Sequence, residues 1–278
     1  MKITATPSNT VSPRTRLAAW GPWLQFGSLR GLALRQCPLE IQNLPAALEG
    51  FRILHISDLH MTKRWHDGYN AAIETIAALD VDVILCTGDI VEDKHTHIPA
   101  MPQVRRLLPA MKSRLGFYSV LGNHDNYKLG RDLRDMGIKM LDGERQEISG
   151  APSPIELIAA PGHRREHFSE GFAARFAPPT QAVPRIVMAH FPDHYPKLAP
   201  LAPDIFLCGH THGGQICLPG GWPIFRHDSS PRALCRGQHR RGNTHYIVNH
   251  GFGCSMWNLR LFCPPEIILI TLHRARSS

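Results

Sequence analysis

The sequence predicts an α/β protein in which two β-sheets pack face to face, and three features of the chain indicate this. In the first half, apolar runs of strand length alternate with helical patterns, as in a mostly parallel sheet. In the second half, strand-like runs dominate and helical patterns are few, which favours a second sheet. Five apolar runs each lead into Asp, Asn or His, either at once or after a single Gly or Ser. Because α/β sheets bind ligands at the carboxyl ends of their strands, these ends predict one shared polar site.

The strands and helices of the first half follow from their periodicity. The segment 66–79 places Ala72, Ile76 and Leu79 at roughly helical spacing, and Gly137 ends a later helix. The expected order is strand 51–56, helix 66–79, strand 83–87, helix 102–114, strand 116–121, helix 129–136, and short strands at 138–141 and 155–159.

The second half is expected to add four strands and little helix. We place them at 185–189, 205–208, 246–249 and 267–272, and we assign all four to the second sheet. No internal repeat at a fixed period is present, so a repeat architecture is not indicated.

The chain has 278 residues, which is enough to bury a sizeable core. We divide it into an N-terminal extension at 1–44 and a single main domain at 45–278. Thr, Ser and Pro dominate residues 1–15, so we expect this stretch to be disordered.

The segment 17–34 is mostly apolar and has basic flanks. It contains Trp20 and Trp23, but Gly21-Pro22 and Arg30 interrupt it, so it is too short and broken to span a membrane. It also lacks the pattern of a secretory signal. Two interpretations stay open: a segment that lies in a membrane interface, or a helix packed on the surface of the domain.

Charge and cysteine content restrict the partners and the compartment. The net charge of +8 suits an anionic substrate or a membrane surface, and a solvated basic surface explains it equally well. No basic stripe interleaved with aromatic residues is present, so we expect no nucleic-acid partner, and no obligate protein partner is evident. The seven cysteines are odd in number and form no C-x-x-C pair. This favours a reducing compartment, so we expect a cytoplasmic protein, either free or peripheral on the inner face of the membrane.

Seven polar side chains at the strand ends form a candidate metal site. They combine carboxylate, amide and imidazole groups, and they are Asp58, His60, Asp89, Asn123, His190, His210 and His212. Seven ligands are too many for one tetrahedral ion, but they suit two ions that share a carboxylate, and Asp89 is the natural bridge. Mixed nitrogen and oxygen ligands are compatible with Mn²⁺, Fe or Zn²⁺. Two such ions lower the pKa of a bridging water, which predicts hydrolysis at phosphorus by the resulting hydroxide.

His124 is the candidate proton donor of this site. It stands between Asn123 and Asp125, in the four-residue motif that follows the predicted strand 116–121. Because the metal pair supplies the attacking hydroxide, the remaining need is a proton for the leaving oxygen. We expect Asp125 to orient the His124 imidazole and to favour its charged form.

Taken in order along the chain, these motifs resemble those of the calcineurin-like metallophosphoesterase superfamily. They are Asp-x-His, Gly-Asp, Gly-Asn-His-Asp, an isolated His and Gly-His-Thr-His, and they span residues 58–212. The resemblance implies a two-sheet β-sandwich flanked by helices, and hydrolase activity on phosphate esters or phosphoanhydrides. It implies one metal ion held by Asp58, His60, Asp89 and His212, a second held by Asp89, Asn123, His190 and His210, and a catalytic His124.

A narrower resemblance concerns the second half of the chain. The motifs at 209–215, 251–253 and 264–267 are similar to those of a bacterial branch of membrane-associated phosphodiesterases. Some members of that branch cleave the pyrophosphate of UDP-2,3-diacylglucosamine in lipid A synthesis. This resemblance implies a phosphodiesterase or pyrophosphatase that uses a lipid-linked diphosphate as its substrate.

Four further side chains are candidates for substrate binding, namely Arg164, Arg165, Arg260 and His250. Arginine can grip a phosphate through bidentate hydrogen bonds, and His250 stands beside Gly251 near the predicted pocket. For each of the four, a solvated or structural residue is the alternative. Two other functions also stay open: a soluble phosphodiesterase acting on nucleotides or other small diesters, and a non-catalytic, metal-bound scaffold.

Overall fold

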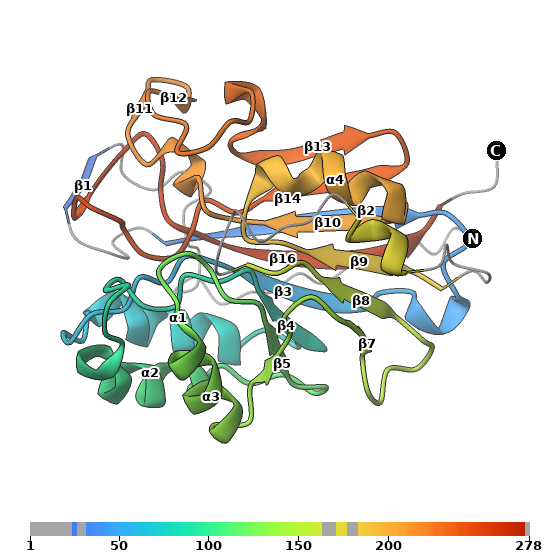
Figure 1. Ribbon diagram of the computed structural model, residues 1–278, viewed down its shortest axis with the longest axis horizontal. Helices are drawn as coiled ribbons and strands as arrows, with labels where there is room; N and C mark the ends of the chain where they lie inside the picture. The colour runs from blue at the N-terminus through green and yellow to red at the C-terminus, as the bar shows by residue number, and fades with distance from the viewer. Residues whose placement is uncertain (1–23, 27–31, 163–170, 177–182, 276–278) are drawn as a thin grey trace, which may run out of the picture.

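The computed structural model describes residues 24–26, 32–162, 171–176 and 183–275. Two six-stranded β-sheets pack against each other, and helices cover their outer faces (Figure 1). The predicted α/β class and the predicted pair of facing sheets are therefore confirmed.

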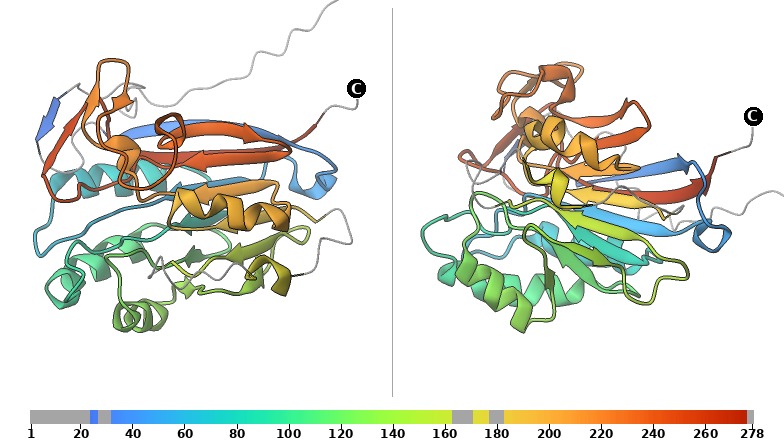
Figure 2. Two further views of the ribbon diagram at one scale, coloured as in Figure 1. Left: turned by 45° about the horizontal axis from the view of Figure 1, so that its top comes forward. Right: turned by 45° about the vertical axis from the view of Figure 1, so that its right-hand side comes forward.

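The first sheet carries the alternation of strands and helices that the first half of the sequence predicts. Its order is β2 (Ala33–Ile41), β16 (Glu266–Arg274), β3 (Arg52–Ile56), β4 (Val83–Cys86), β5 (Phe117–Ser119) and β6 (Lys139–Met140). Strands β3 to β6 are parallel, and β16 runs antiparallel to β3. The helices between them are α1 (Asp67–Ala77), α2 (Met101–Leu107) and α3 (Tyr127–Asp135), which lie together on one side of the sheet (Figure 2).

The second sheet has a parallel centre and antiparallel edges. Its order is β13 (Gly237–Arg241), β14 (Thr244–Val248), β10 (Ile205–Cys208), β9 (Arg185–Met188), β8 (Glu156–Ala159) and β7 (Arg145–Glu147). Strands β8, β9, β10 and β14 are parallel, whereas β13 and β7 pair antiparallel with their neighbours. The short helix α4 (Tyr195–Leu198) packs on the outer face of this sheet.

Two small two-stranded sheets lie at one end of the sandwich. One pairs β1 (Leu24–Phe26) with β15 (Leu259–Leu261), and the other pairs β11 (Cys217–Leu218) with β12 (Trp222–Pro223). Both are seen at the left of Figure 1, where β11 and β12 stand out from the two large sheets.

Side-chain alternation along the strands divides the core into layers. In β3, Ile53 faces the interior between the sheets, whereas Leu54 faces the helices. The layer between the sheets takes apolar side chains from both, including Leu157 and Ile186 of the second sheet. Because both faces of each central strand are covered, these strands are continuous apolar runs, which is why the sequence predicts them well.

One predicted strand belongs to the other sheet. Residues 267–272 were assigned to the second sheet, but β16 lies in the first, between β2 and β3. It pairs with β2 over nine residues, from Glu266↔Ala33 to Arg274↔Ile41. A local apolar pattern predicts that a strand forms but not which partner it finds, because that depends on contacts across the whole chain.

Strand β2 is a segment that the sequence did not predict as a strand. It lies at the edge of its sheet, where Pro38 is exposed between the buried Cys37 and Leu39. Proline is tolerated on edge strands because its missing N–H costs no ladder bond there. This strand stands on the N-terminal side of the predicted domain boundary at residue 45, and the division of the chain at that point stays a prediction.

The two interpretations of 17–34 concern a segment that the structure describes only in part. Within it, Leu24–Phe26 form β1 and β2 begins at Ala33, so the described residues of this segment are extended rather than helical. Residues 17–23 and 27–31 lie outside the described part of the chain. Among the described residues, none of the helices has both the length and the apolar character that a membrane span requires.

Candidate metal centre

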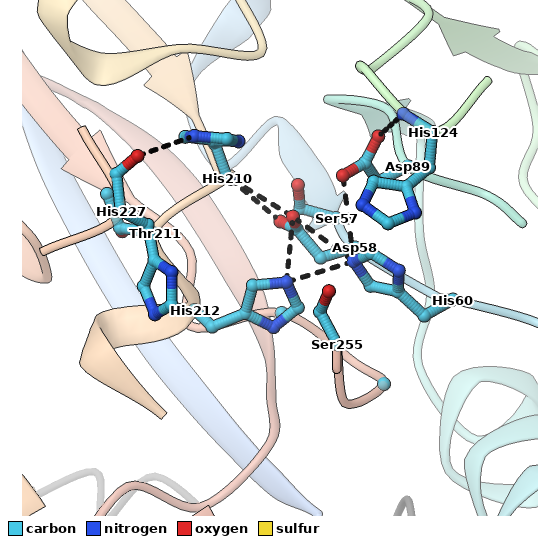
Figure 3. A network of polar contacts seen from close by, with 12 residues as sticks. Ser57, Asp58, His60, Asp89, His124, His210, Thr211, His212, His227 and Ser255 are labelled. Carbon is cyan, nitrogen blue, oxygen red and sulfur yellow. Dashed lines mark hydrogen bonds and ion pairs between the residues drawn. The ribbon is translucent and has the colours of Figure 1, made fainter. Parts of the chain in front are cut away.

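The seven candidate ligands lie at the carboxyl ends of strands from both sheets. Asp58 and His60 follow β3, Asp89 follows β4, Asn123 follows β5, His190 follows β9, and His210 and His212 follow β10. Because the two sheets face each other, their strand ends meet in one place. Figure 3 shows Asp58, His60, Asp89 and His212 gathered around a common centre, with His210 beside them. Apart from Asn123 and His210, these side chains are buried.

The first group of ligand atoms belongs to Asp58, His60 and His212. The Nε2 atoms of the two histidines lie 2.9 Å apart, and Asp58 Oδ1 lies 3.4 Å from His212 Nε2 and 3.9 Å from His60 Nε2. Burial, together with the positive charges of His60 and Arg260, lowers the pKa of His212 well below its usual value. The ring is therefore held neutral, which is the form that binds metal ions.

The second group surrounds the ring of His190. Its Nε2 atom lies 3.0 Å from Asn123 Oδ1, 3.2 Å from His210 Nδ1 and 3.3 Å from Asp89 Oδ2. Its other nitrogen, Nδ1, lies 2.7 Å from the carbonyl oxygen of Thr87, which can accept its proton. That hydrogen bond fixes the ring and directs Nε2 into the site.

Asp89 joins the two groups. Its Oδ2 atom lies 3.6 Å from His60 Nε2 and 3.3 Å from His190 Nε2, so one carboxylate oxygen faces both. Its Oδ1 atom accepts a hydrogen bond from the backbone N–H of His124 at 2.8 Å. Burial raises the pKa of Asp89, but the charge of His190 and a hydrogen bond from it outweigh burial and lower the pKa overall. The carboxylate is therefore ionised, as a bridging ligand requires.

The contact between Asp89 and His190 also shifts the pKa of His190, in the opposite direction. Burial lowers the pKa of this histidine, yet the charges of Asp89 and Asp58 raise it to about 9. At neutral pH the metal-free ring carries a proton, so a metal ion that binds here has to displace it.

The backbone of the site is bent at nearly every candidate ligand. Positive φ angles of 43° to 65° occur at five of the seven, which are Asp58, His60, Asp89, His210 and His212. Residues other than glycine rarely adopt this conformation, and each instance costs on the order of 1–3 kcal/mol. Such strain persists only where surrounding contacts impose it, and its concentration at these five residues is typical of a functional site.

The residues present fit divalent metal ions. Three overlapping groups each bring three ligand atoms within 4.8 Å of one another, namely Asp58, His60 and His212; His60, Asp89 and His124; and Asp89, His190 and His210. All the atoms are imidazole nitrogens or carboxylate oxygens, and the amide of Asn123 adds another oxygen. This donor set suits Mn²⁺, Fe or Zn²⁺, and it contains no thiolate.

His124 stands at the edge of the cluster with a side chain that is 21% exposed. Its ring lies 4.8 Å from the ring of His60 between centroids. Its Nδ1 atom lies 2.5 Å from the backbone carbonyl oxygen of Glu92, which can accept its proton. The free Nε2 atom is then the one able to exchange a proton with a bound ligand.

Asp125 does not take the position that the sequence suggested. We expected it to orient the ring of His124, but its carboxylate instead accepts three backbone hydrogen bonds. The donors are Ile90 at 2.9 Å, Val91 at 3.2 Å and Gly122 at 2.9 Å. Asp125 thus ties the loop after β4 to the loop after β5. Burial and the charge of Asp89 raise its pKa to about 6.

Glu92 is a residue of the site that the sequence analysis missed. Its Oε2 atom lies 2.5 Å from His60 Nδ1, and its backbone carbonyl contacts His124. The available signal was its place three residues after Asp89, at the start of a polar loop that follows a strand end. A single carboxylate in a polar loop is common, so this position indicates a site residue only when the fold is known.

The candidates for substrate binding differ in position. Arg260 is 1% exposed, and its guanidinium donates to the backbone carbonyls of His250, Gly251, Gly253 and Cys263, among others. It is therefore a buried structural residue, and the expectation that it grips a phosphate is corrected. His250 is also buried, and its backbone N–H donates to Glu266 at 2.9 Å. Arg164 and Arg165 lie outside the described residues.

Comparison with known proteins agrees with this geometry. Residues 51–214 match a family model described as calcineurin-like phosphoesterase, and this range contains all seven candidate ligands. The chain is 28% identical over 248 residues to "Uncharacterized metallophosphoesterase YkuE" of Bacillus subtilis, covering 82% of this chain and 81% of that protein.

Two other relatives have names that state an activity. "Phosphodiesterase YaeI" of Escherichia coli is 28% identical over 237 residues, which cover 80% of this chain and 82% of that protein. "UDP-2,3-diacylglucosamine pyrophosphatase LpxG" of Chlamydia trachomatis is 24% identical over 287 residues, which cover 82% of this chain and 86% of that protein.

Proposed function

The chain belongs to the calcineurin-like phosphoesterase family, a family of metal-dependent hydrolases, and from this premise we propose that it cleaves a phosphodiester or a pyrophosphate bond at a two-metal centre. The observation that supports this most directly is the position of Asp89 Oδ2, which faces His60 Nε2 on one side and His190 Nε2 on the other.

The donor atoms divide into two sets that share Asp89. Asp58, His60 and His212 would hold one divalent ion, and Asn123, His190 and His210 would hold the other. Two divalent ions at such a site supply water of lowered pKa and neutralise charge on the phosphoryl oxygens.

His124 delivers the proton that the leaving oxygen needs. Its Nδ1 proton is held by the Glu92 carbonyl, so the exchange takes place at Nε2. The partial exposure of its side chain leaves the ring accessible to a substrate that enters from solvent. General acid catalysis of this kind contributes typically 10²- to 10⁴-fold to a rate.

For the substrate we favour a lipid-linked diphosphate of the UDP-2,3-diacylglucosamine kind, cleaved by a protein that is peripheral on the inner face of a membrane. The net charge of +8 suits an anionic membrane surface, and one relative is named for this activity. The seven cysteines are all free and buried, which suits a reducing compartment. A soluble diester is the second candidate, since another relative is named as a phosphodiesterase.

The test is hydrolysis of bis(p-nitrophenyl) phosphate by metal-stripped protein that is reloaded with Mn²⁺, Fe²⁺ or Zn²⁺. We expect metal-dependent turnover that falls at least 100-fold in His124→Ala and in Asp89→Ala. His95→Ala, which changes an exposed histidine of the neighbouring loop, serves as the matched control and keeps its activity.

Metal content separates the two variants. His124→Ala is expected to retain two ions per chain, whereas Asp89→Ala loses at least one, because it removes the shared ligand. A protein that holds two ions but hydrolyses no phosphodiester, pyrophosphate or lipid-linked diphosphate contradicts the proposal and favours the scaffold interpretation.

A further inference from the structure

Exposed apolar side chains gather beside the candidate metal centre. Eight large apolar side chains are exposed in the described part of the chain, and six of them lie on three segments of the second half. These six, which we call the apolar rim, are Leu218, Trp222, Ile224, Phe225, Met256 and Trp257, with exposures from 39% to 76%. The other two, Ile98 and Tyr127, belong to the helical side of the first sheet.

Two contacts join members of the rim in pairs. Leu218 and Trp222 are direct partners across the β11–β12 pair. The rings of Phe225 and Trp257 lie 5.8 Å apart between centroids, so segments 32 positions apart in the sequence meet here. Both views in Figure 2 show β11 and β12 standing clear of the large sheets.

The rim is attached to the candidate ligands at two points. The backbone carbonyl of His227, two residues after Phe225, lies 3.2 Å from His210 Nε2. The backbone N–H of Met256 donates to Glu92 Oε1 at 3.3 Å, and the other oxygen of Glu92 contacts His60. Figure 3 shows His227 and Ser255 beside the cluster. A molecule seated on the rim therefore lies next to the metal centre.

Buried hydrogen bonds hold the rim in place. Gln215 is 4% exposed, and its side-chain amide donates to the carbonyls of Ser255 at 2.9 Å and Trp257 at 3.0 Å. Its Oε1 atom accepts from the N–H of Ser255 at 3.0 Å. Exposed aromatic residues on a preformed loop bind with a small entropy cost, because little ordering remains to be done.

Exposed arginines stand next to the rim. Residues 216–262 contain six arginines, of which Arg260 is buried, and a single acidic residue, Asp228. Arg226 and Arg232 are exposed, and within the described residues neither forms an ion pair with a carboxylate. Their guanidinium groups donate to backbone carbonyls instead, Arg226 to Ser230 at 3.5 Å and Arg232 to Ile224 at 3.2 Å. These cations stand next to the apolar side chains rather than on a separate face.

We propose that the apolar rim docks on an anionic lipid bilayer and holds the metal centre at the membrane surface, an inference that rests on the proposed phosphoesterase function. Tryptophan and phenylalanine enter the boundary between headgroups and acyl chains, and neighbouring arginines pair with anionic headgroups. An apolar patch beside two arginines that form no ion pair with any described residue matches this arrangement of the bilayer surface. A rim that bound a second copy of this chain would bring like charges together.

The test measures sedimentation of the full-length protein with vesicles of phosphatidylglycerol and phosphatidylcholine, against vesicles of phosphatidylcholine alone. The rim variant combines Trp222→Ala, Phe225→Ala and Trp257→Ala. The matched control combines Ile98→Ala and Tyr127→Ala, which remove exposed apolar side chains from the other side of the molecule. We expect wild type and control to bind the anionic vesicles, and the rim variant to bind at least tenfold more weakly.

A second variant tests the charge. Arg226→Gln with Arg232→Gln is expected to weaken binding to anionic vesicles several-fold and to reduce its dependence on salt. Two results overturn the proposal: wild type that does not sediment with anionic vesicles, or a rim variant that binds them as well as wild type. A wild-type dimer that the rim variant converts to a monomer also overturns it, because the rim is then an interface between copies.

Turnover of bis(p-nitrophenyl) phosphate distinguishes this proposal from the proposed function. The rim variant is expected to hydrolyse this soluble diester at the wild-type rate, since the rim holds no candidate ligand. If vesicle binding depends on the rim but no diester or lipid-linked diphosphate is hydrolysed, the docking surface stands and the proposed function fails. If the protein hydrolyses one of these substrates but does not bind vesicles, the proposed function stands and the docking surface fails.

Discussion

Glu92 contacts the candidate metal centre with both its side chain and its backbone. The carboxylate lies 2.5 Å from Nδ1 of His60, whose Nε2 faces the first group of ligand atoms. Its backbone carbonyl contacts Nδ1 of His124 at 2.5 Å. A carboxylate behind a metal-binding histidine fixes the ring and raises the basicity of the ligand nitrogen. Glu92 is therefore a positioning residue for both rings.

Glu92→Gln is expected to weaken metal binding while the fold is retained. The neutral amide cannot stabilise charge on His60, and such substitutions typically cost 10- to 100-fold in metal affinity or activity. Titration of the metal-free protein with Mn²⁺ measures the affinity, and turnover at saturating Mn²⁺ measures the remaining effect on His124. Glu74→Gln, at an exposed position of α1, is the control. Equal Mn²⁺ affinity in both variants would show that Glu92 has no positioning role.

The ends of β4 and β5 approach each other too closely for a side chain. A Cβ atom added at Gly122 would lie 2.2 Å from Oδ1 of Asp89 and 2.5 Å from its backbone nitrogen. A Cβ atom at Gly88 would lie 2.4 Å from the nitrogen of Gly122. The two glycines thus let neighbouring strand ends place Asp89 and Asn123 side by side. Their role is close approach rather than a simple turn.

Gly122→Ala is expected to displace the Asp89 carboxylate and to abolish binding of at least one metal ion. Overpacking of a buried site costs typically 1–3 kcal/mol, so we expect the protein to remain folded but less stable. The control is Gly130→Ala in α3, where the new methyl group meets the Leu121 methyl groups at an ordinary 3.6 Å. That change should leave metal content unchanged and raise stability by up to about 1 kcal/mol. Full metal content in Gly122→Ala contradicts this account.

The core of the sandwich contains a histidine, His55, that burial keeps in its neutral form. His55 of β3 is fully buried, and its Nε2 atom lies 3.0 Å from Thr87 Oγ1. The same strand places Ile53 in the layer between the sheets, and alternation puts His55 on that side as well. Burial lowers the pKa of His55 from 6.5 to about 3. The folded protein therefore keeps this ring neutral at pH values where the unfolded chain protonates it.

The stability of the whole protein should consequently fall as the pH drops below about 6.5. The unfolded chain binds a proton there that the folded protein does not, so the free energy of unfolding decreases by about 1.4 kcal/mol per pH unit from this group until about pH 3. Urea unfolding of the metal-stripped protein at pH 7.5 and pH 5 measures the loss. In His55→Gln the loss between these two pH values should be smaller by about 2 kcal/mol. An identical loss in both proteins would exclude His55 as the source.

The sequence by itself determined the chemistry of the site and most of the strands that carry it. Apolar runs that end in Asp-x-His, Gly-Asp, Asn-His-Asp and Gly-His-Thr-His are local patterns, and residue type alone limits which metal ions they suit. The central strands were predictable because both of their faces are buried, which makes each a continuous apolar run. Local patterns of this kind do not depend on the path of the chain between them.

Only the tertiary structure decided how distant segments combine. His60 and His212 meet across 152 positions, β16 pairs with β2 across more than 200, and the rim joins loops from separate parts of the second half. The roles of Asp125, Glu92 and Arg260 depend on which backbone groups surround each side chain after folding. The positive φ angles at five of the candidate ligands are likewise imposed by tertiary packing, which overrides the local conformational preference of these residues. These features arise from competition among many long-range contacts, and the outcome of that competition cannot be predicted from a local pattern of residues.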